Sequence, residues 1–324
     1  MQAGPVLDKV RAAKTFFCGL NRDLIEYSTA DGHGNRAQFD ADLCTAVAVA
    51  VLGPKAKVSL TAYPDEPKSL EALRKGEVDL VPTATPDFGN TVMSGLNFGY
   101  PILFDAQSFI VLKSLHIKSA NELSGRRICY LDSTGVADNL HDFAARGTFD
   151  FKPFPFTEQG EMEAAFITNN CQAMASDITQ LANMRLAFRR LADNYEIIPD
   201  NIAPDPLAPV YAANDRDWSA IIQWTMQALI MAEAEGITRA NVDSKLKSEE
   251  YRVQRLLGVT TGYGNKLKLA DDWALNVIRA VGNYGEIYDR DLGMNSPLKI
   301  PRGPNELMIH GGLLYPLPLR IDHD

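Results

Sequence analysis

Polar side chains follow a short apolar run in residues 76–90 (GEVDLVPTATPDFGN), a pattern typical of a buried strand that leads into a loop. The loop carries the hydroxyls of Thr83 and Thr85, the carboxylate of Asp87 and the amide of Asn90, but neither Arg nor Lys. A carboxylate with no cation beside it favours a positively charged ligand, and all four groups can accept hydrogen bonds. If this loop borders a ligand site, we expect a solute that donates hydrogen bonds and carries positive charge.

Other patterns in the chain do not indicate catalysis, metal binding or phosphate binding. Residues 258–269 (GVTTGYGNKLKL) are rich in glycine but lack the Gly-Lys-Ser/Thr of a phosphate-binding loop. The histidines have no metal-ligand spacing and do not lie beside a plausible nucleophile; they are His33, His116, His141, His310 and His323. We therefore expect no metal, no cofactor and no catalytic residue.

Length, composition and charge indicate a globular protein of two domains. The chain has 324 residues, of which 46% are hydrophobic, and this length is more than one domain with a single hydrophobic core usually has. Lys and Arg number 32 against 41 for Asp and Glu, and the net charge of −9 argues against a nucleic-acid partner. The apolar runs are shorter than the roughly 18 residues that a membrane-spanning helix needs.

The N-terminal residues and the cysteines bear on the cellular compartment. Residues 1–17 (MQAGPVLDKVRAAKTFF) lack the apolar stretch of a secretion signal, which indicates a cytoplasmic protein or a mature form whose leader has been removed. The chain has four cysteines and no C-x-x-C pair. This disfavours zinc and thioredoxin-like chemistry and leaves disulfides or buried thiols.

Two stretches of the chain resemble each other and predict two α/β units. Residues 69–87 and 161–179 each have the pattern of a helix, a polar turn, an apolar strand and a loop with hydroxyls and an Asp. A strand with a Cys and then a helix come before each stretch; the strands are expected in 14–24 and 126–136 and the helices in 39–53 and 136–147. This alternation predicts largely parallel sheets in two lobes.

A helical pattern over residues 218–235 follows the second unit, and we expect it to rejoin the first lobe. The chain would then cross between the lobes twice, near residues 107–113 and 206–212, which would form a two-stranded hinge. Ligands of open α/β sheets bind beyond the carboxyl ends of the strands, so we expect a cleft between the lobes that closes on a small molecule. The expected division is 1–107 with 213–324 for lobe 1 and its C-terminal helical extension, and 108–212 for lobe 2 with the hinge strands.

Four segments closely resemble the periplasmic general L-amino-acid-binding proteins of bacterial ABC transporters: residues 17–53, 70–80, 280–303 and 311–320. The likeness runs nearly end to end, and the GNYGEIYDR and SPLKI motifs are specific to that subfamily. The resemblance implies a two-lobed type II periplasmic binding fold, a periplasmic location and delivery of the ligand to an inner-membrane permease. It also implies the disulfides Cys18–Cys44 and Cys129–Cys171.

The chain departs from this family in the loop of the opening segment. Relatives carry an Arg there that clamps the α-carboxylate of the ligand, whereas the aligned PTATPDFGN, residues 82–90, has none. Two charge-assisted hydrogen bonds are worth roughly 1.5–3 kcal/mol each, so their loss would lower the affinity for free amino acids by roughly two to four decades. Either another group replaces this Arg, or the ligand has a masked, shifted or absent α-carboxylate.

Three residues of the second unit stand at ligand-binding positions of the family. Asp177 is kept where relatives bind the ammonium group of the ligand, and Ser133 and Thr134 stand in the motif whose hydroxyls and backbone N–H groups bind its carboxylate. Each of them also suits the start of a helix, so a purely structural capping role is the alternative.

The first loop of the chain differs from its relatives as well. Arg22, Asp23 and Glu26 add charges there, and Tyr27 replaces a Phe that walls the pocket of relatives. Arg22 is a candidate substitute for the missing Arg, although such a residue is more commonly an exposed surface Arg. The expected ligand-binding set is Arg22, Glu26, Tyr27, Thr83, Thr85, Asp87, Ser133, Thr134 and Asp177.

The resemblance favours a monomeric solute-binding protein that captures an amine-bearing or amino-acid-derived solute for an ABC transporter. Two alternatives stay open at this point. One is an enzyme on the same fold, dehydratase-like, with Glu26 or Asp87 as general acid. The other is a periplasmic partner protein that binds no small ligand.

Overall fold

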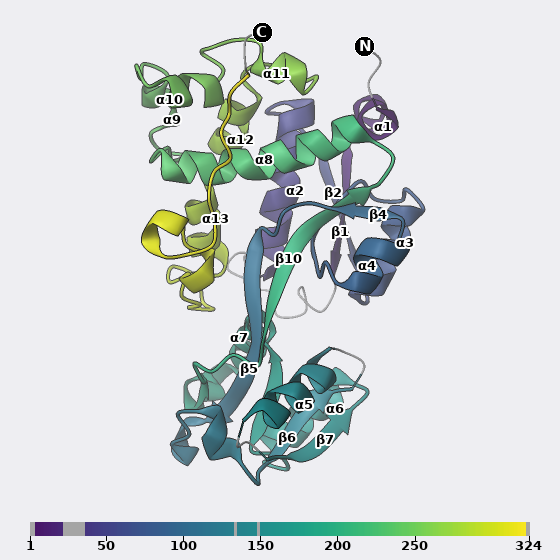
Figure 1. The fold of residues 1–324 in the computed structure, drawn as a ribbon, viewed down its shortest axis with the longest axis vertical. Coiled ribbons are helices and arrows are strands. Elements are labelled where there is room, and N and C mark those ends of the chain that lie inside the picture. Colours follow the sequence, from purple (N-terminus) through teal and green to yellow (C-terminus); the bar gives the residue numbers. More distant parts are fainter. Residues whose placement is uncertain (1–3, 22–35, 133–134, 148–149, 322–324) are drawn as a thin grey trace. The chain divides into compact units, whose positions relative to one another are not determined.

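The computed structural model of the chain describes residues 4–21, 36–132, 135–147 and 150–321, which form a mixed α/β fold (Figure 1). They separate into two compact units, Met1–Leu103 with Leu207–Asp324, and Phe104–Pro206. The boundaries between the units fall inside two long strands, β5 (Leu103–Leu112) and β10 (Ala203–Ala212). Each unit is considered separately below.

The first unit joins a small β-structure to a large set of helices. Its strands are β1 (Phe16–Asn21), β2 (Val58–Tyr63), β3 (Val81–Ala84) and β4 (Leu96–Phe98). The first residue of β5 and the last part of β10 also belong to this unit. Its N-terminal helices are α1 (Pro5–Ala13), α2 (Arg36–Leu52), α3 (Glu66–Arg74) and α4 (Phe88–Met93). Its C-terminal helices are α8 (Arg216–Ala234), α9 (Val242–Lys245), α10 (Tyr251–Leu256), α11 (Tyr263–Lys266), α12 (Trp273–Val281) and α13 (Tyr284–Asp291), with short 3-10 turns at Gly303–Asn305 and Met308–His310.

The strands of the first unit place the loop after β3 beside the start of α2. β1 pairs in parallel with β2, and a parallel bridge joins Cys18 of β1 to Leu80, just before β3. β10 pairs with β3 and β4 in antiparallel register. Because β1 and β3 run in the same direction, their carboxyl ends lie at one edge, where ligands of α/β folds usually bind.

Helix α2 forms the centre of the first unit. Its run of Ala and Val leaves little side-chain bulk, and most of its residues are buried. The helix packs against β1, α8, α12 and α13, and Figure 1 shows the long helix α8 crossing α2 and α12. The ring of Phe39 in α2 stands nearly perpendicular to two rings of α13, those of Tyr284 and Tyr288, in T-shaped contacts. The expected rejoining of the C-terminal helices is thus seen in their packing on α2.

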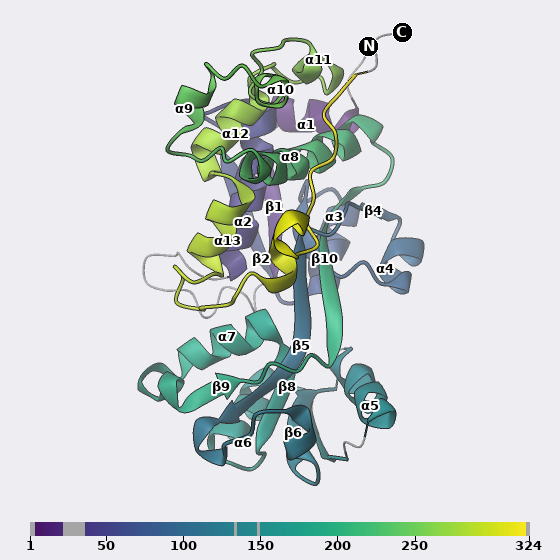
Figure 2. The same ribbon diagram turned by 60° about the vertical axis from the view of Figure 1, so that its left-hand side comes forward.

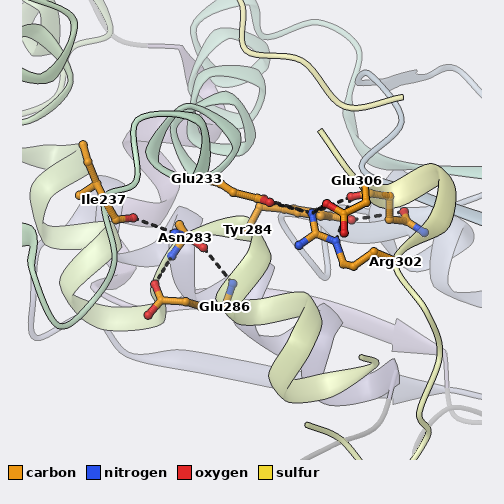
Figure 3. A network of polar contacts seen from close by, with 8 residues as sticks. Glu233, Ile237, Asn283, Tyr284, Glu286, Arg302 and Glu306 are labelled. Carbon is orange, nitrogen blue, oxygen red and sulfur yellow. Dashed lines mark hydrogen bonds and ion pairs between the residues drawn. The ribbon is translucent and has the colours of Figure 1, made fainter. Parts of the chain in front are cut away.

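A partly buried ion pair attaches the C-terminal segment to these helices (Figure 3). Nη2 of Arg302 lies 2.9 and 3.2 Å from the two carboxylate oxygens of Glu233. The guanidinium also lies over the rings of Tyr284 and Tyr288, 5.4 and 5.2 Å from their centroids. Since a planar guanidinium can donate in its plane and stack on its face at once, one Arg connects α8, α13 and the C-terminal segment.

The second unit is a sheet with helices packed on it. Its strands are β5, β6 (Arg127–Leu131), β7 (Lys152–Phe156), β8 (Ala173–Asp177), β9 (Tyr195–Ile197) and the first part of β10. Its helices are α5 (Val136–Arg146), α6 (Gln159–Ile167) and α7 (Ile178–Ala187), with 3-10 turns at Lys113–Leu115, Ala120–Leu123 and Arg189–Asn194. β6 pairs in parallel with β7 and β8, whereas β5 pairs in antiparallel register with β8 and β9. Figure 2 shows α7 beside β9.

Both implied disulfides are present, one in each unit. Cys18 of β1 pairs with Cys44 of α2, with their Cα atoms 6.2 Å apart. Cys129 of β6 pairs with Cys171, just before β8, with their Cα atoms 5.8 Å apart. The disulfide pairing from the resemblance is therefore confirmed, although the second cysteine of each pair lies at a different place in its unit.

Candidate functional site

Five of the expected ligand-binding residues lie outside the described residues. They are Arg22, Glu26, Tyr27, Ser133 and Thr134. The ligand-binding roles of these five residues stay predictions. The geometry below concerns Thr83, Thr85, Asp87 and Asp177 and the side chains around them.

Thr83 lies at the carboxyl end of β3 and is part of a buried polar network. Its hydroxyl lies 2.8 Å from both carboxylate oxygens of Asp40 and receives a hydrogen bond of 2.7 Å from Nη2 of Arg36. Nε of Arg36 is 3.4 Å from Asp40 Oδ1. All three residues are buried: Thr83 is 8% exposed, Asp40 2% and Arg36 5%. The Thr83 hydroxyl therefore already donates to a carboxylate and accepts from a guanidinium.

Arg36 is a residue that sequence reasoning missed. The loop after β3 contains no cation of its own. The fold nevertheless brings the guanidinium of Arg36 within hydrogen-bond distance of the Thr83 hydroxyl, which comes just before this loop. The expected helix began at residue 39, whereas α2 begins at Arg36, so that Arg36 and Asp40 lie one turn apart. The Arg-x-x-x-Asp spacing was the sequence feature from which the Arg36–Asp40 pair could have been predicted. Its partner Thr83 is 47 residues away and could not be identified locally.

Burial dominates the electrostatics of this network. The pKa of Asp40 is raised above its ordinary value because burial removes water from the carboxylate; the charge of Arg36 and the hydrogen bonds from Thr83 and Arg36 act in the opposite direction. Arg36 thus partly compensates the charge of a buried carboxylate near the carboxyl ends of β1 and β3.

The remaining loop residues hold the loop itself together. Asp87 is exposed and caps α4, where its carboxylate accepts the backbone N–H of Asn90 at 2.6 Å. The amide of Asn90 donates to the Thr85 carbonyl at 2.9 Å and to Glu66 at 3.2 Å, and Glu66 also accepts the backbone N–H of Thr85 at 3.1 Å. The side chains of Asp87 and Asn90 thus have a structural use, which the Asp-x-x-Asn spacing indicates.

In the second unit, Asp177 lies where β8 ends and α7 begins. It occupies the N-cap position of α7, but its side chain makes no capping hydrogen bond. On the sheet it lies directly opposite Gln107 of β5. The Gln107 side chain in turn accepts a hydrogen bond of 3.0 Å from the amide of Asn139 in α5. Sequence reasoning had named neither amide as a site residue.

In the described part of the chain, no group of three or more His, Cys, Asp or Glu side chains could hold a metal ion. Of the helices described, none combines the length and the apolar character that crossing a membrane requires.

Comparisons with known proteins cover nearly the whole chain. No protein-family model matches it. The chain is 39% identical over 317 residues to the general L-amino acid-binding periplasmic protein AapJ of Rhizobium johnstonii, covering 97% of this chain and 92% of that protein. It is 35% identical over 316 residues to the glutamate/glutamine/aspartate/asparagine-binding protein BztA of Rhodobacter capsulatus, with coverage of 97% and 93%.

A solved structure agrees with these relatives. A periplasmic binding protein of an ABC transporter from Brucella ovis, with glutathione bound, is 34% identical and superposes with a TM-score of 0.86 over 97% of this chain and 99% of that one. A cysteine-binding protein from Campylobacter jejuni shares the type II binding-protein fold, at 19% identity and a TM-score of 0.53. The expected fold class is therefore confirmed, and the chain belongs to the family of amino-acid-binding periplasmic proteins of ABC transporters.

Proposed function

We propose that this protein works in the periplasm, where it captures an amine-bearing or amino-acid-derived small polar solute and presents it to the inner-membrane permease of an ABC transporter. The relatives are named for L-amino acids, and the Brucella ovis structure contains glutathione. All of these molecules carry an ammonium group. We further propose that the protein acts as a monomer and without catalysis. We also propose that it has no nucleic-acid partner, which its net charge of −9 supports.

The position of Asp177 is the observation that carries the solute class. Its carboxylate stands at the carboxyl end of a sheet strand and is not used to cap α7. A carboxylate at this edge of an α/β fold can accept hydrogen bonds from an ammonium group and neutralise its charge. We therefore assign the ammonium contact to Asp177.

Binding of the solute tests this assignment. Protein purified from the periplasm should release a stoichiometric solute on denaturation, identified by mass spectrometry. Asp177→Asn should weaken binding of that solute on the order of 100-fold or more, because removing one partner of a buried ion pair costs about 3–5 kcal/mol. Titration calorimetry measures the effect.

A matched variant separates binding from folding. Asp150 is exposed and lies in the same unit, so Asp150→Asn should bind like the wild type. Both variants should melt at the wild-type temperature. Equal affinity of Asp177→Asn and Asp150→Asn would remove Asp177 from the site, and a solute without an amine would refute the proposed class. Release of a chemically altered solute would instead favour catalysis.

A further inference from the structure

Gln107 is a polar side chain buried in the middle of β5. Only 7% of its surface is exposed. Its amide oxygen accepts the hydrogen bond from Asn139, but its amide nitrogen makes no hydrogen bond to any residue within the described ranges. An amide has two N–H donors, and this nitrogen is not among the described side-chain atoms that are shut off from solvent without a partner. The geometry thus leaves a donor within reach of solvent that a bound molecule can use.

The register of the sheet places this donor beside Asp177. Gln107 and Asp177 are directly opposite each other on antiparallel strands, so their side chains project from the same face with Cβ atoms about 4.5–5.5 Å apart. The next residue of β5 on that face is Phe109, whose ring contacts Phe143 of α5. Gln107 and Asp177 therefore point toward the face that α5 covers.

Asn139 completes the group from the first turn of α5. It is partly exposed, and its amide nitrogen donates to Gln107. Its amide oxygen accepts no hydrogen bond from the residues that the structure describes. Whichever way the two amides are turned, their mutual bond uses one N–H and one oxygen, so that the pair keeps one nitrogen and one oxygen for a ligand. A carboxylate, an amide donor and an amide acceptor thus meet within one unit of the protein.

We propose that Gln107 and Asn139 are ligand-recognition residues, which bind the carbonyl group next to the ammonium that Asp177 holds. This inference rests on the proposed function and deepens it. The amide nitrogen of the pair donates to a carbonyl or carboxylate oxygen of the solute, and the amide oxygen accepts from its ammonium or amide N–H. The ligand class is an α-amino acid or an α-amino amide, including the N-terminal residue of a small peptide.

The neutral donor has a consequence for specificity. A guanidinium neutralises a carboxylate, whereas an amide N–H satisfies a neutral carbonyl oxygen without excess charge. Near the negative charge of Asp177, a neutral carbonyl is also repelled less than a free carboxylate. We therefore expect the site to accept primary amides of amino acids at least as well as the free acids.

Calorimetric titration of a panel of L-amino acids and their primary amides tests the proposal. Gln107→Met keeps the length of the side chain but removes both polar atoms, and it should weaken binding about tenfold, the effect of one or two lost hydrogen bonds. Gln107→Glu keeps the shape and adds a negative charge. It should raise the ratio of amide affinity to acid affinity about tenfold, which a merely structural Gln107 would not do.

Gln172→Met is the matched control. Gln172 precedes β8 at the end opposite Asp177, and its amide oxygen likewise accepts one hydrogen bond, from the backbone of Arg127. This variant should bind like the wild type. If Gln107→Met binds within twofold of Gln172→Met while Asp177→Asn loses binding, the amide pair has no recognition role and the proposed function stands. If the wild type binds no member of the panel, the recognition of free amino acids and their primary amides is refuted, and the solute released from the periplasmic protein decides whether the wider amine-bearing class stands.

Discussion

Replacing Arg36 should reveal how strongly the fold depends on the pair that it forms with Asp40. The side chains of the two residues are only 6% and 2% exposed. Arg36→Met keeps the aliphatic stem and removes the charge, so that Asp40 becomes a buried carboxylate with only the Thr83 hydroxyl as a described partner in this network. Breaking a buried pair on one side costs about 3–5 kcal/mol, and we expect a loss in this range at pH 7.

The sign of the pH dependence follows from the pKa of Asp40. Burial raises this pKa in the folded state above the ordinary value of 3.8, and Arg36 opposes the rise. Without Arg36 the folded pKa rises further, while that of the unfolded chain does not change. A carboxyl group with a raised folded pKa binds its proton more tightly in the native state, so its protonation stabilises the fold as the pH falls. The penalty of Arg36→Met should therefore shrink between pH 7 and pH 5.

Urea unfolding followed by circular dichroism at both pH values measures this effect. The transition must be fitted for each unit, because a chain with two units need not unfold in one step. The double variant Arg36→Met/Asp40→Asn has no buried charge at this place; it should regain much of the stability and lose the extra pH dependence. A penalty below about 1 kcal/mol, or one that is equal at both pH values, would refute the reasoning about a buried charge.

Two further predictions concern the scaffold. The intact mass should be four hydrogens below that of the fully reduced chain, and free thiols at all four cysteines would contradict this prediction. Reduction should also lower the melting temperature, because closing loops of 26 and 42 residues stabilises the fold by about 3.5 and 4 kcal/mol in the chain-entropy model. Arg302→Lys should destabilise the first unit by about 1–3 kcal/mol, because a lysine keeps the charge at Glu233 but loses the Nε–H bond to the Asn305 carbonyl and the planar group that lies over the two tyrosine rings. Calorimetric melting at pH 7 measures this loss, and an unchanged transition would show that charge alone suffices.

Local patterns in the sequence were sufficient for much of the architecture. The helices over residues 136–147 and 218–235 are seen as α5 (Val136–Arg146) and α8 (Arg216–Ala234), because an apolar stripe at helical spacing and a polar start are properties of one continuous segment. The capping role of Asp87 could be read in the same way from the four residues that form it. Family resemblance added the cysteine pairing, which no local pattern specifies.

The polar contacts at the candidate site were decided only by the tertiary structure. Arg36 reaches Thr83 across 47 residues, and Asn139 reaches Gln107 across 32. Gln107 faces Asp177 because of the strand register, and a shift of one residue would turn its amide to the other face of the sheet. A sequence pattern shows which side chains share a strand or a helix, but their partners on other elements depend on how those elements pack.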